Sequence, residues 1–307
     1  MDRDAAAQHV GLTVGALLFN WPRDKWRDFY ARLADEAPVD VVCLGEVVCS
    51  KRTEISPDVI AETADRLQRG GKSVVLSTGA LITLLRERKE CAGIANNAHL
   101  ECEINDFTAL AYHRPGQRFR IGPLVNVYNE GTLQFLSGLG ASSVCLPPEL
   151  SLGAVESLAQ AARGLDMGCE IWSFGRIPLA ISGRCYHARI ASRTKDSCRL
   201  VCLQDSDGLD VKTMDGKNFL SINGVQTLSH SYCCTVDDID KLKAAGVTSL
   251  RLSPHSCDMV TISEIFRARL DGHMDADEAW SRIRNVCGPV GFTNGFLSGG
   301  AGAGPNH

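Results

Sequence analysis

Apolar and amphipathic stretches alternate along most of the chain, and this alternation predicts the secondary structure. Val39 to Leu44 is rich in β-branched residues without regular polar alternation, as expected of a strand buried on both faces. Lys25 to Ala34 places its large apolar side chains at helical spacing. The strands that we expect are Leu12 to Phe19, Val39 to Leu44, Ser73 to Leu76, Leu100 to Ile104, Phe119 to Val127, Ser143 to Leu146, Cys169 to Phe174 and Thr248 to Leu252.

Helices are expected between most of these strands. Ser56 and Pro57 are the residue types of an N-cap and a first helical position, so a helix should begin there and end near Arg69. Eight buried strands that alternate with helices predict an α/β fold of the (β/α)8, TIM-barrel-like kind. An open doubly wound sheet is the alternative, but no GxGxxG or Walker sequence follows any strand. The other expected helices follow Thr78-Gly79 as far as Lys89, follow Asn105 and Asp106, cover Leu133 to Leu139, extend from the cap Ser151 to Arg163, and cover Ile239 to Ala245 and Ile262 to Leu270.

Two segments depart from this alternation. Residues 175 to 237 form a long insertion after the seventh strand, with an expected hairpin of Leu209 to Met214 and Phe219 to Ile222. From Phe292 onward the chain is rich in glycine, which predicts disorder. The expected organisation is therefore a single barrel domain over residues 1 to 291 and a disordered tail over residues 292 to 307.

Composition narrows the class of protein. The first residues lack the basic and apolar segments of a signal peptide, and no apolar run is long enough to span a membrane. We therefore expect a cytoplasmic protein, in which thiols stay reduced. The net charge of −4 provides no general positive field for nucleic acid, so we expect no nucleic-acid partner.

Thirteen cysteines are present, and three of them lie in one short basic stretch after the seventh strand. Cys185, Cys198 and Cys202 have the spacing C-x12-C-x3-C, and Cys49 lies just beyond the second strand. Because the carboxyl ends of barrel strands meet at one rim, these four thiols are candidate metal ligands. Zinc, an iron–sulfur cluster and an accidental grouping, with Cys198 and Cys202 one helical turn apart, are all compatible with the spacing. Cys43 and most other cysteines have the apolar surroundings of small core residues.

Three further polar residues are candidates for catalysis. Glu46 and Glu149 stand at strand ends on the same rim, and His187 lies among the basic residues near the cysteines. Each also has a plainer interpretation, because the carboxylates would cap a helix or pair with a rim arginine and the histidine would lie at the surface. The chain has neither HExxH nor GxSxG, so peptidase activity is not expected.

Several longer stretches of the sequence resemble a known family. The chain is similar to the collagenase-like peptidases of unknown catalytic type, and among them to the proteins of anaerobic ubiquinone biosynthesis. The resemblance extends from about Leu12 to Ala279. The matching stretches are LGEVVCSKR from Leu44, VVLSTGAL from Val74, VNVYN from Val125, LPPELS from Leu146, GRIPLAISGRCYHAR from Gly175, TKDSCRLVC from Thr194, LSINGVQTLS from Leu220 and VTSLRLSPHS from Val247.

The resemblance implies a cofactor, partners and a reaction. It implies that Cys49, Cys185, Cys198 and Cys202 bind a 4Fe-4S cluster. It implies a heterodimer with a UbiU-like sister subunit, a UbiT-like lipid-carrier protein as an accessory, and O2-independent hydroxylation of a quinone precursor. Other relatives hydroxylate RNA bases, with prephenate as the oxygen donor. An RNA-base hydroxylase and a zinc-stabilised scaffold without catalysis are therefore the alternatives.

Overall fold

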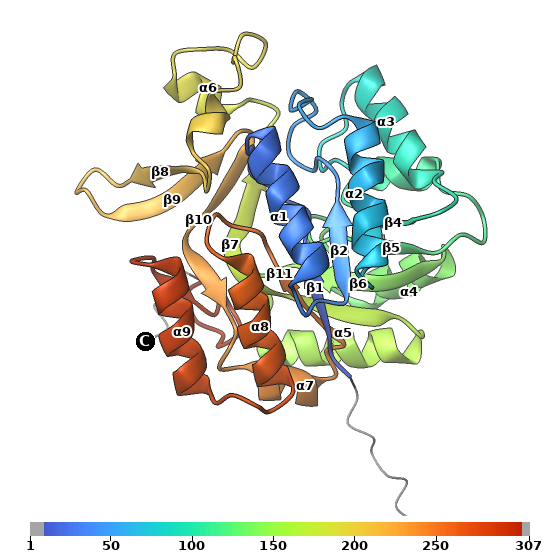
Figure 1. Cartoon of the computed structure of the whole chain (residues 1–307). Helices are drawn as coiled ribbons and strands as arrows, with labels where there is room; N and C mark the ends of the chain where they lie inside the picture. The colour runs from blue at the N-terminus through green and yellow to red at the C-terminus, as the bar shows by residue number, and fades with distance from the viewer. Residues whose placement is uncertain (1–8, 303–307) are drawn as a thin grey trace, which may run out of the picture.

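The structure, a computed structural model, describes residues 9–302. Eight parallel strands form a closed barrel, which Figure 1 shows with helices packed around it. The last of these strands, β11, pairs with both β1 and β7 and thereby closes the sheet. This closure confirms the expected (β/α)8 fold and excludes the open sheet. The barrel strands are β1 (Gly11–Val14), β2 (Val41–Leu44), β3 (Ser73–Ser77), β4 (Glu101–Ile104), β5 (Phe119–Ile121), β6 (Ala141–Leu146), β7 (Gly168–Ile181) and β11 (Ser249–Leu252).

Residues of capping type stand at the start of several outer helices. Helix α2 starts at Pro57 after Ser56, whose hydroxyl accepts the Val59 N–H at 3.5 Å, and this confirms the predicted cap. Ser151 precedes α5 as the expected cap, and Asn129, whose Oδ1 accepts the Thr132 N–H at 2.9 Å, caps α4 although it was not predicted to do so. The helices between barrel strands are α1 (Arg23–Asp35), α2 (Pro57–Arg69), α3 (Leu85–Ala95), α4 (Glu130–Gly138), α5 (Leu152–Gly164) and α7 (Ile239–Ala245), and α8 (Met259–Leu270) follows β11.

Two of the expected helices differ in detail. Helix α3 begins later than predicted, because the Glu87 carboxylate accepts the N–H groups of Thr83 at 2.7 Å and of Leu84 at 2.8 Å. The segment after Asp106 is only a short 3-10 helix, η1 (Phe107–Ala111), in place of an α-helix. Neither difference moves a barrel strand.

The insertion extends the sheet beyond the barrel. Strand β7 continues to Ile181 because its second half pairs antiparallel with β10 (Gln226–Cys234), a strand that the sequence did not predict. The expected hairpin is present as β8 (Leu209–Lys212) and β9 (Asn218–Asn223), and β9 pairs with β10. Between β7 and β8 the chain forms α6 (Tyr186–Ile190) and the 3-10 helix η2 (Val201–Gln204). Figure 1 shows this unit standing above the barrel beside one end of α1.

The C-terminal part of the chain packs back onto the molecule. Helix α9 (Ala276–Cys287), which the sequence analysis did not predict, contacts α8. Strand β12 (Phe292–Thr293) pairs with β10, and Leu297 is buried in the hydrophobic core. Residues 292 to 302 therefore have defined packing in place of the expected disorder, and residues 303 to 307 lie outside the described part.

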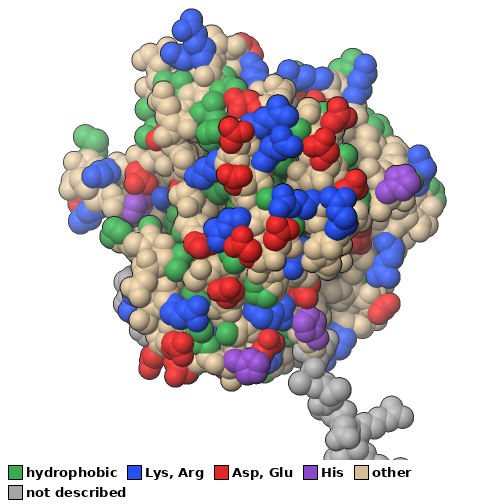
Figure 2. Space-filling model, in the orientation of Figure 1, with side chains coloured by type: hydrophobic (Ala, Val, Ile, Leu, Met, Phe, Trp, Pro, Cys, Tyr) green, Lys and Arg blue, Asp and Glu red, His purple; other side chains and the backbone are tan. Residues whose placement is uncertain are grey.

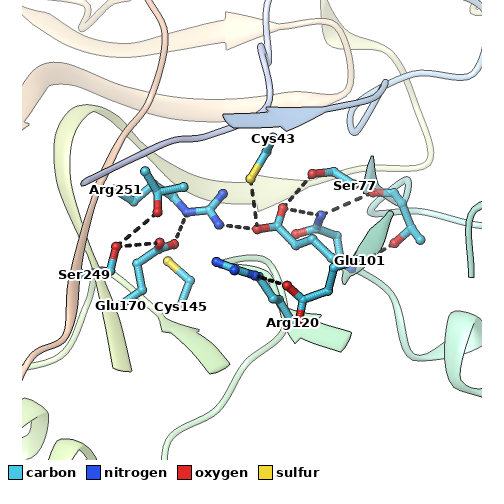
Figure 3. A network of polar contacts seen from close by, with 12 residues as sticks. Cys43, Ser77, Glu101, Arg120, Cys145, Glu170, Ser249 and Arg251 are labelled. Atoms are coloured by element: carbon cyan, nitrogen blue, oxygen red, sulfur yellow. Dashed lines mark hydrogen bonds and ion pairs between the residues drawn. The ribbon is translucent and has the colours of Figure 1, made fainter. Parts of the chain in front are cut away.

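Charged side chains cross the interior of the barrel in a connected network, shown in Figure 3. Arg251 on β11 pairs with Glu103, and its Nε donates to Glu170 at 2.5 Å. Ser77 donates to Glu103 at 2.8 Å, and Arg120 pairs with Glu101 at 2.6 Å. These contacts link side chains of β3, β4, β5, β7 and β11, and so they fix these barrel strands relative to one another.

The amino ends of the barrel strands surround a cavity of about 470 Å3. Glu101, Arg120, Glu170 and Ser249 line it and form hydrogen bonds among themselves and with neighbouring residues. In barrels of this kind the amino-terminal face contributes to stability and the carboxyl-terminal face to chemistry. The functional site is therefore expected at the opposite rim.

Candidate functional site

The four candidate cysteines lie on two segments that meet at the carboxyl-end rim. Cys49 is in the loop between β2 and α2, and Cys185 caps α6 in the insertion, where its sulfur accepts the Ala188 N–H at 3.4 Å. Lys51 joins the two segments, because its Nζ donates to the carbonyl of Lys195 at 2.8 Å. The loop of Cys49 and the insertion thus lie together at the rim, as the positions of their strands in the sequence predicted.

One apolar cluster surrounds most of the cysteine group. Cys49, Cys185 and Cys198 pack in it beside Val47 and Ala188. Cys185 and Cys202 are each only 8% exposed. Burial raises the pKa of the Cys185 thiol, and the neighbouring Cys202 and Cys198 raise it further. The three cysteines of the insertion are therefore electrostatic neighbours, with Cys185 and Cys202 buried and Cys198 half-buried.

Arg52 connects the cysteines of the two segments. Its side chain is 3% exposed. Burial opposes its charge, but the Glu46 carboxylate and then Cys202 and Cys49 hold its pKa above the ordinary value. The Asn20 side chain reaches the same thiol, with its Nδ2 donating to Cys202 Sγ at 3.4 Å. A guanidinium is thus enclosed among candidate thiolate ligands.

The hydrogen bonds of Arg52 are incomplete. Nη1 donates to the carbonyl of Leu18 at 2.6 Å, and Nη2 donates to Asn223 Oδ1 at 2.7 Å. Nη1 also lies 3.5 Å from Glu46 Oε1. The Nε atom is buried, and no group within residues 9–302 accepts a hydrogen bond from it. An unpartnered buried N–H is costly, and an anionic group bound by the thiols would provide an acceptor.

The chain between Cys198 and Cys202 has an unusual backbone. Arg199 and Leu200 have φ angles of 49° and 50°, in the left-handed region that non-glycine residues rarely adopt. The expectation of a helical pair one turn apart is therefore wrong. Two successive left-handed residues cost of order 1–3 kcal/mol each, and such strain concentrates at ligand sites. The C-x3-C segment is a tight turn that presents its two thiols to the site.

His187 is buried, with an exposed fraction of 4%, so its interpretation as a surface side chain is wrong. Its Nε2 lies 2.7 Å from Asp205 Oδ2, and its Nδ1 accepts the Gly224 N–H at 3.5 Å. Both ring nitrogens are engaged, which anchors α6 to the turn between β9 and β10. His187 therefore anchors the helix that Cys185 caps.

Glu46 lies beside the cysteine group, whereas Glu149 does not contact it. Glu46 Oε1 accepts the N–H groups of Val48 and Cys49, both at 2.8 Å, and its side chain is 29% exposed. Burial raises the pKa of Glu46, opposed by Arg52. Glu149 is exposed and accepts a hydrogen bond from the Tyr128 hydroxyl. Glu46 thus combines pairing with a rim arginine, as its plainer interpretation required, with direct support of Cys49.

Other cysteines are structural. Cys43 is fully buried, its Sγ lies 3.8 Å from Glu103, and burial raises its pKa. Cys233 and Cys234 are buried in β10. The neighbouring Cys287 thiol, together with burial, raises the pKa of Cys257, although the spacing of these two cysteines gave no sign that they are close.

The fit to a cofactor depends on the donor set. Within residues 9–302, no three or more His, Cys, Asp or Glu side chains are close enough to hold one metal ion. A 4Fe-4S cubane takes one thiolate on each iron, so its ligands surround a larger group than a single ion. Four cysteines, a dry apolar lining and a buried Arg N–H without an acceptor suit such an anionic group.

Comparison with known proteins places the chain in a family. The molecule is a closed parallel barrel that carries thiols on its carboxyl-end rim. The model of peptidase family U32 matches residues 25–305, and the chain belongs to this family. The collagenase of Porphyromonas gingivalis W83 is 25% identical over 213 residues, which make up 64% of this chain and 50% of that protein. The chain therefore spans about half the length of this curated relative.

The solved structures that resemble the chain have lower sequence identity to it. The endo-β-1,4-mannanase of Thermotoga petrophila aligns over 80% of this chain and 68% of its own, with 8% identity and a TM-score of 0.42. The spore cortex-lytic enzyme SleL of Bacillus cereus aligns over 86% of this chain and 75% of its own, with 10% identity and a TM-score of 0.37.

Proposed function

We propose that the protein is the iron–sulfur subunit of a heterodimer required for O2-independent hydroxylation in ubiquinone biosynthesis. Within family U32 it would be the UbiV-like member, paired with a UbiU-like sister subunit. The observation that carries the proposal is the buried Arg52, whose Nε lacks an acceptor beside Cys49 and Cys202. A positive charge held there favours an anionic group bound by the thiols.

The residues of this chain would hold the cofactor and exclude water from it. Cys49, Cys185, Cys198 and Cys202 would be the ligands of a 4Fe-4S cluster, and the apolar cluster that includes Val47 would keep the site dry. A 4Fe-4S cluster supplies one-electron redox chemistry whose potential depends on nearby charge and hydrogen bonds. Arg52 would supply this charge, and Asn20 would supply a hydrogen bond to Cys202.

The proposed partners follow from the same function. They are the UbiU-like subunit, a UbiT-like lipid-carrier protein that delivers the quinone precursor, and prephenate as the oxygen donor, in the cytoplasm. No helix within residues 9–302 has the length and apolar character to cross a membrane. Lys and Arg side chains are interspersed with Asp and Glu side chains on the face seen in Figure 2. Arg66 of α2 pairs with Asp35 of α1 at 2.6 Å. This mixed surface does not favour RNA as the substrate.

Cysteine variants test the ligand assignment. We expect Cys198→Ala, purified without air, to lose iron and acid-labile sulfide, because the insertion would lose a thiolate from the site. The matched control is Cys43→Ala, which removes a buried thiol inside the barrel and should keep both. Loss of the iron in Cys43→Ala together with its retention in Cys49→Ala would contradict the assignment. Binding of transfer or ribosomal RNA would favour the RNA-base hydroxylase instead.

A further inference from the structure

The cavity at the amino ends of the barrel strands, on the face opposite the cysteine group, is large enough for a small molecule. Its volume of about 470 Å3 lies within the range of ligand pockets, roughly 300–1,000 Å3. The interior of such a barrel is normally filled by layers of bulky side chains. Here Ser143 of β6 lies in register with Gly168 of β7, and Ser249 lines the cavity from β11. The cavity is thus the space that these three small residues leave.

Two arginines line the cavity and have hydrogen-bond donors that no described residue uses. Arg118 directly precedes β5, is exposed, and pairs with no group in residues 9–302. Arg120 donates from Nε to Glu101 at 2.6 Å, and its two terminal nitrogens make no hydrogen bond within the same part of the chain. The Arg120 side chain is 25% exposed, so these nitrogens are open to the cavity. Guanidinium groups with free N–H groups are well suited to bind a carboxylate.

Two carboxylates line the same cavity. Glu170 accepts hydrogen bonds from Arg251 at 2.5 Å and from Ser249 at 3.2 Å, and Glu101 accepts one from Ser142 at 2.5 Å. Each carboxylate oxygen can accept a second bond. With two guanidinium groups and two carboxylates, the lining is neutral as a whole. The carboxylates would repel a simple anion and the guanidinium groups a simple cation, whereas a ligand with one charge of each sign meets an opposite charge at both.

The opposite charges of the lining are near one another. Only β6 separates β5 from β7 in the sheet, a distance of about 10 Å at about 4.8 Å for each strand. Figure 3 shows the Arg120 guanidinium between the carboxylates of Glu101 and Glu170. Burial opposes the Arg120 charge, but Glu101 and then Glu170 hold its pKa above the ordinary value. A ligand that pairs with both signs therefore carries its own two charges close together, as the ammonium and carboxylate groups of an α-amino acid are.

We propose that this cavity binds a free α-amino acid, whose carboxylate pairs with Arg118 and Arg120 and whose ammonium group pairs with Glu170. Ser143 lies on the strand between the two ends, and its hydroxyl makes no hydrogen bond with any residue that the structure describes. The side chain of the amino acid occupies the rest of the volume. Because the cavity and the cysteine group lie at opposite ends of the barrel, this binding does not depend on the proposed iron–sulfur function.

Thermal unfolding of the full chain, purified without air, tests the proposal with each standard α-amino acid added singly at millimolar concentration. We expect at least one of them to raise the melting temperature, because a ligand that binds only the folded state stabilises it. Isothermal titration calorimetry of that amino acid should then show saturable binding. Its N-acetyl derivative lacks the ammonium group and its amide lacks the carboxylate. Each should bind about tenfold more weakly or worse, for the loss of a hydrogen bond between charged groups.

Variants locate the binding in the cavity. Arg118→Gln should weaken it about tenfold, and it should fold as the parent does because Arg118 has no partner within residues 9–302. The matched control is Arg88→Gln, which removes an exposed arginine of α3 and should leave the affinity unchanged. Cys198→Ala, which is expected to lose the cluster, should also bind the amino acid as the parent does.

Saturable binding of none of the amino acids would overturn the proposal. Equal affinity for the amino acid and either of its two derivatives would overturn the requirement for both charges, and this comparison needs no variant to fold. An unchanged affinity in Arg118→Gln would place the ligand outside the cavity. None of these results bears on the iron and labile sulfide content, so the proposed function stands or falls separately.

Discussion

The guanidinium of Arg251 inside the barrel and that of Arg52 at the rim are both buried, but their partners differ. Arg251 lies between two carboxylates, Glu103 and Glu170. Arg52 has one carboxylate at 3.5 Å, a carbonyl, an amide oxygen and thiols, and its Nε has no acceptor. Both carboxylate partners of Arg251 come from the protein itself, whereas within residues 9–302 the Nε of Arg52 lacks an acceptor. This contrast is the physical reason to place a bound group at the rim.

The largest expected effect comes from breaking the interior network. Arg251→Met leaves Glu103 and Glu170 without their common partner. We expect it to lower the free energy of unfolding by about 3–5 kcal/mol, the usual cost of an uncompensated buried charge. Urea denaturation measures this value. A loss below about 1 kcal/mol would show that the interior charges are not the tightly coupled network described above.

A smaller effect is expected from pH, through the buried His255 near the end of β11. Its Nδ1 lies 3.1 Å from the Ser253 carbonyl, and its Nε2 accepts the Arg176 N–H at 3.4 Å. Burial lowers the pKa of His255 to about 4, against the opposing charge of Asp207. The unfolded chain takes up this proton near pH 6.5, so between these values it binds more protons than the folded protein, and stability falls as the pH is lowered.

The expected loss from this residue is about 3 kcal/mol between pH 6.5 and pH 4, at about 1.4 kcal/mol for each pKa unit. Thermal or urea unfolding across this range measures it. In His255→Gln this part of the pH dependence should disappear. An unchanged pH profile in that variant would assign the dependence to other groups.

Removing the rim charge should cost less stability than removing the interior one. Arg52→Gln deletes the hydrogen bonds to Leu18 and Asn223, and we expect a loss of about 2 kcal/mol. In the cluster-bearing protein the midpoint reduction potential should also become lower, because a positive charge near the cluster is lost. Arg27→Gln is the control, since its exposed pair with Glu62 is worth about 0.5 kcal/mol or less. The same potential in Arg52→Gln and the parent protein would place Arg52 outside the site.

The smallest expected effect comes from a variant that lowers stability without removing a ligand. It tests whether cofactor content depends on the ligands or on stability in general. Ser56→Ala removes the cap of α2, just after the Cys49 loop, and should cost about 1 kcal/mol in urea denaturation. Iron and sulfide content should be unchanged. Loss of the cluster in this variant would mean that cofactor content follows stability and does not identify ligands.

The sequence predicted the barrel because its strands are buried on both faces and therefore appear as apolar runs. Strand β10 was missed, because Gln226 to Cys234 mixes polar and apolar residues and is held by pairing with β7 and β9. The C-terminal segment was misjudged because glycine content does not reveal that Phe292 and Leu297 reach the core.

The candidate site was predictable only in part. The barrel topology was enough to bring the loop of Cys49 to the rim that carries the insertion. Arg52 was visible in the sequence only as a basic residue three positions after a candidate ligand. Its role depends on Leu18 and Asn223, which are distant in sequence. The left-handed turn after Cys198 has no glycine to announce it, and so the spacing suggested a helix.

Analysis of the chain co-expressed and purified without air with its UbiU-like partner tests the central claim most directly. Iron, zinc and acid-labile sulfide are measured together with the visible and EPR spectra. A Cys49→Ala chain in the same complex reports what this subunit contributes. The account predicts about four iron and four sulfide for each intact chain, with the spectrum of a 4Fe-4S cluster, and their loss from the variant chain. Zinc without labile sulfide in the intact chain would contradict it.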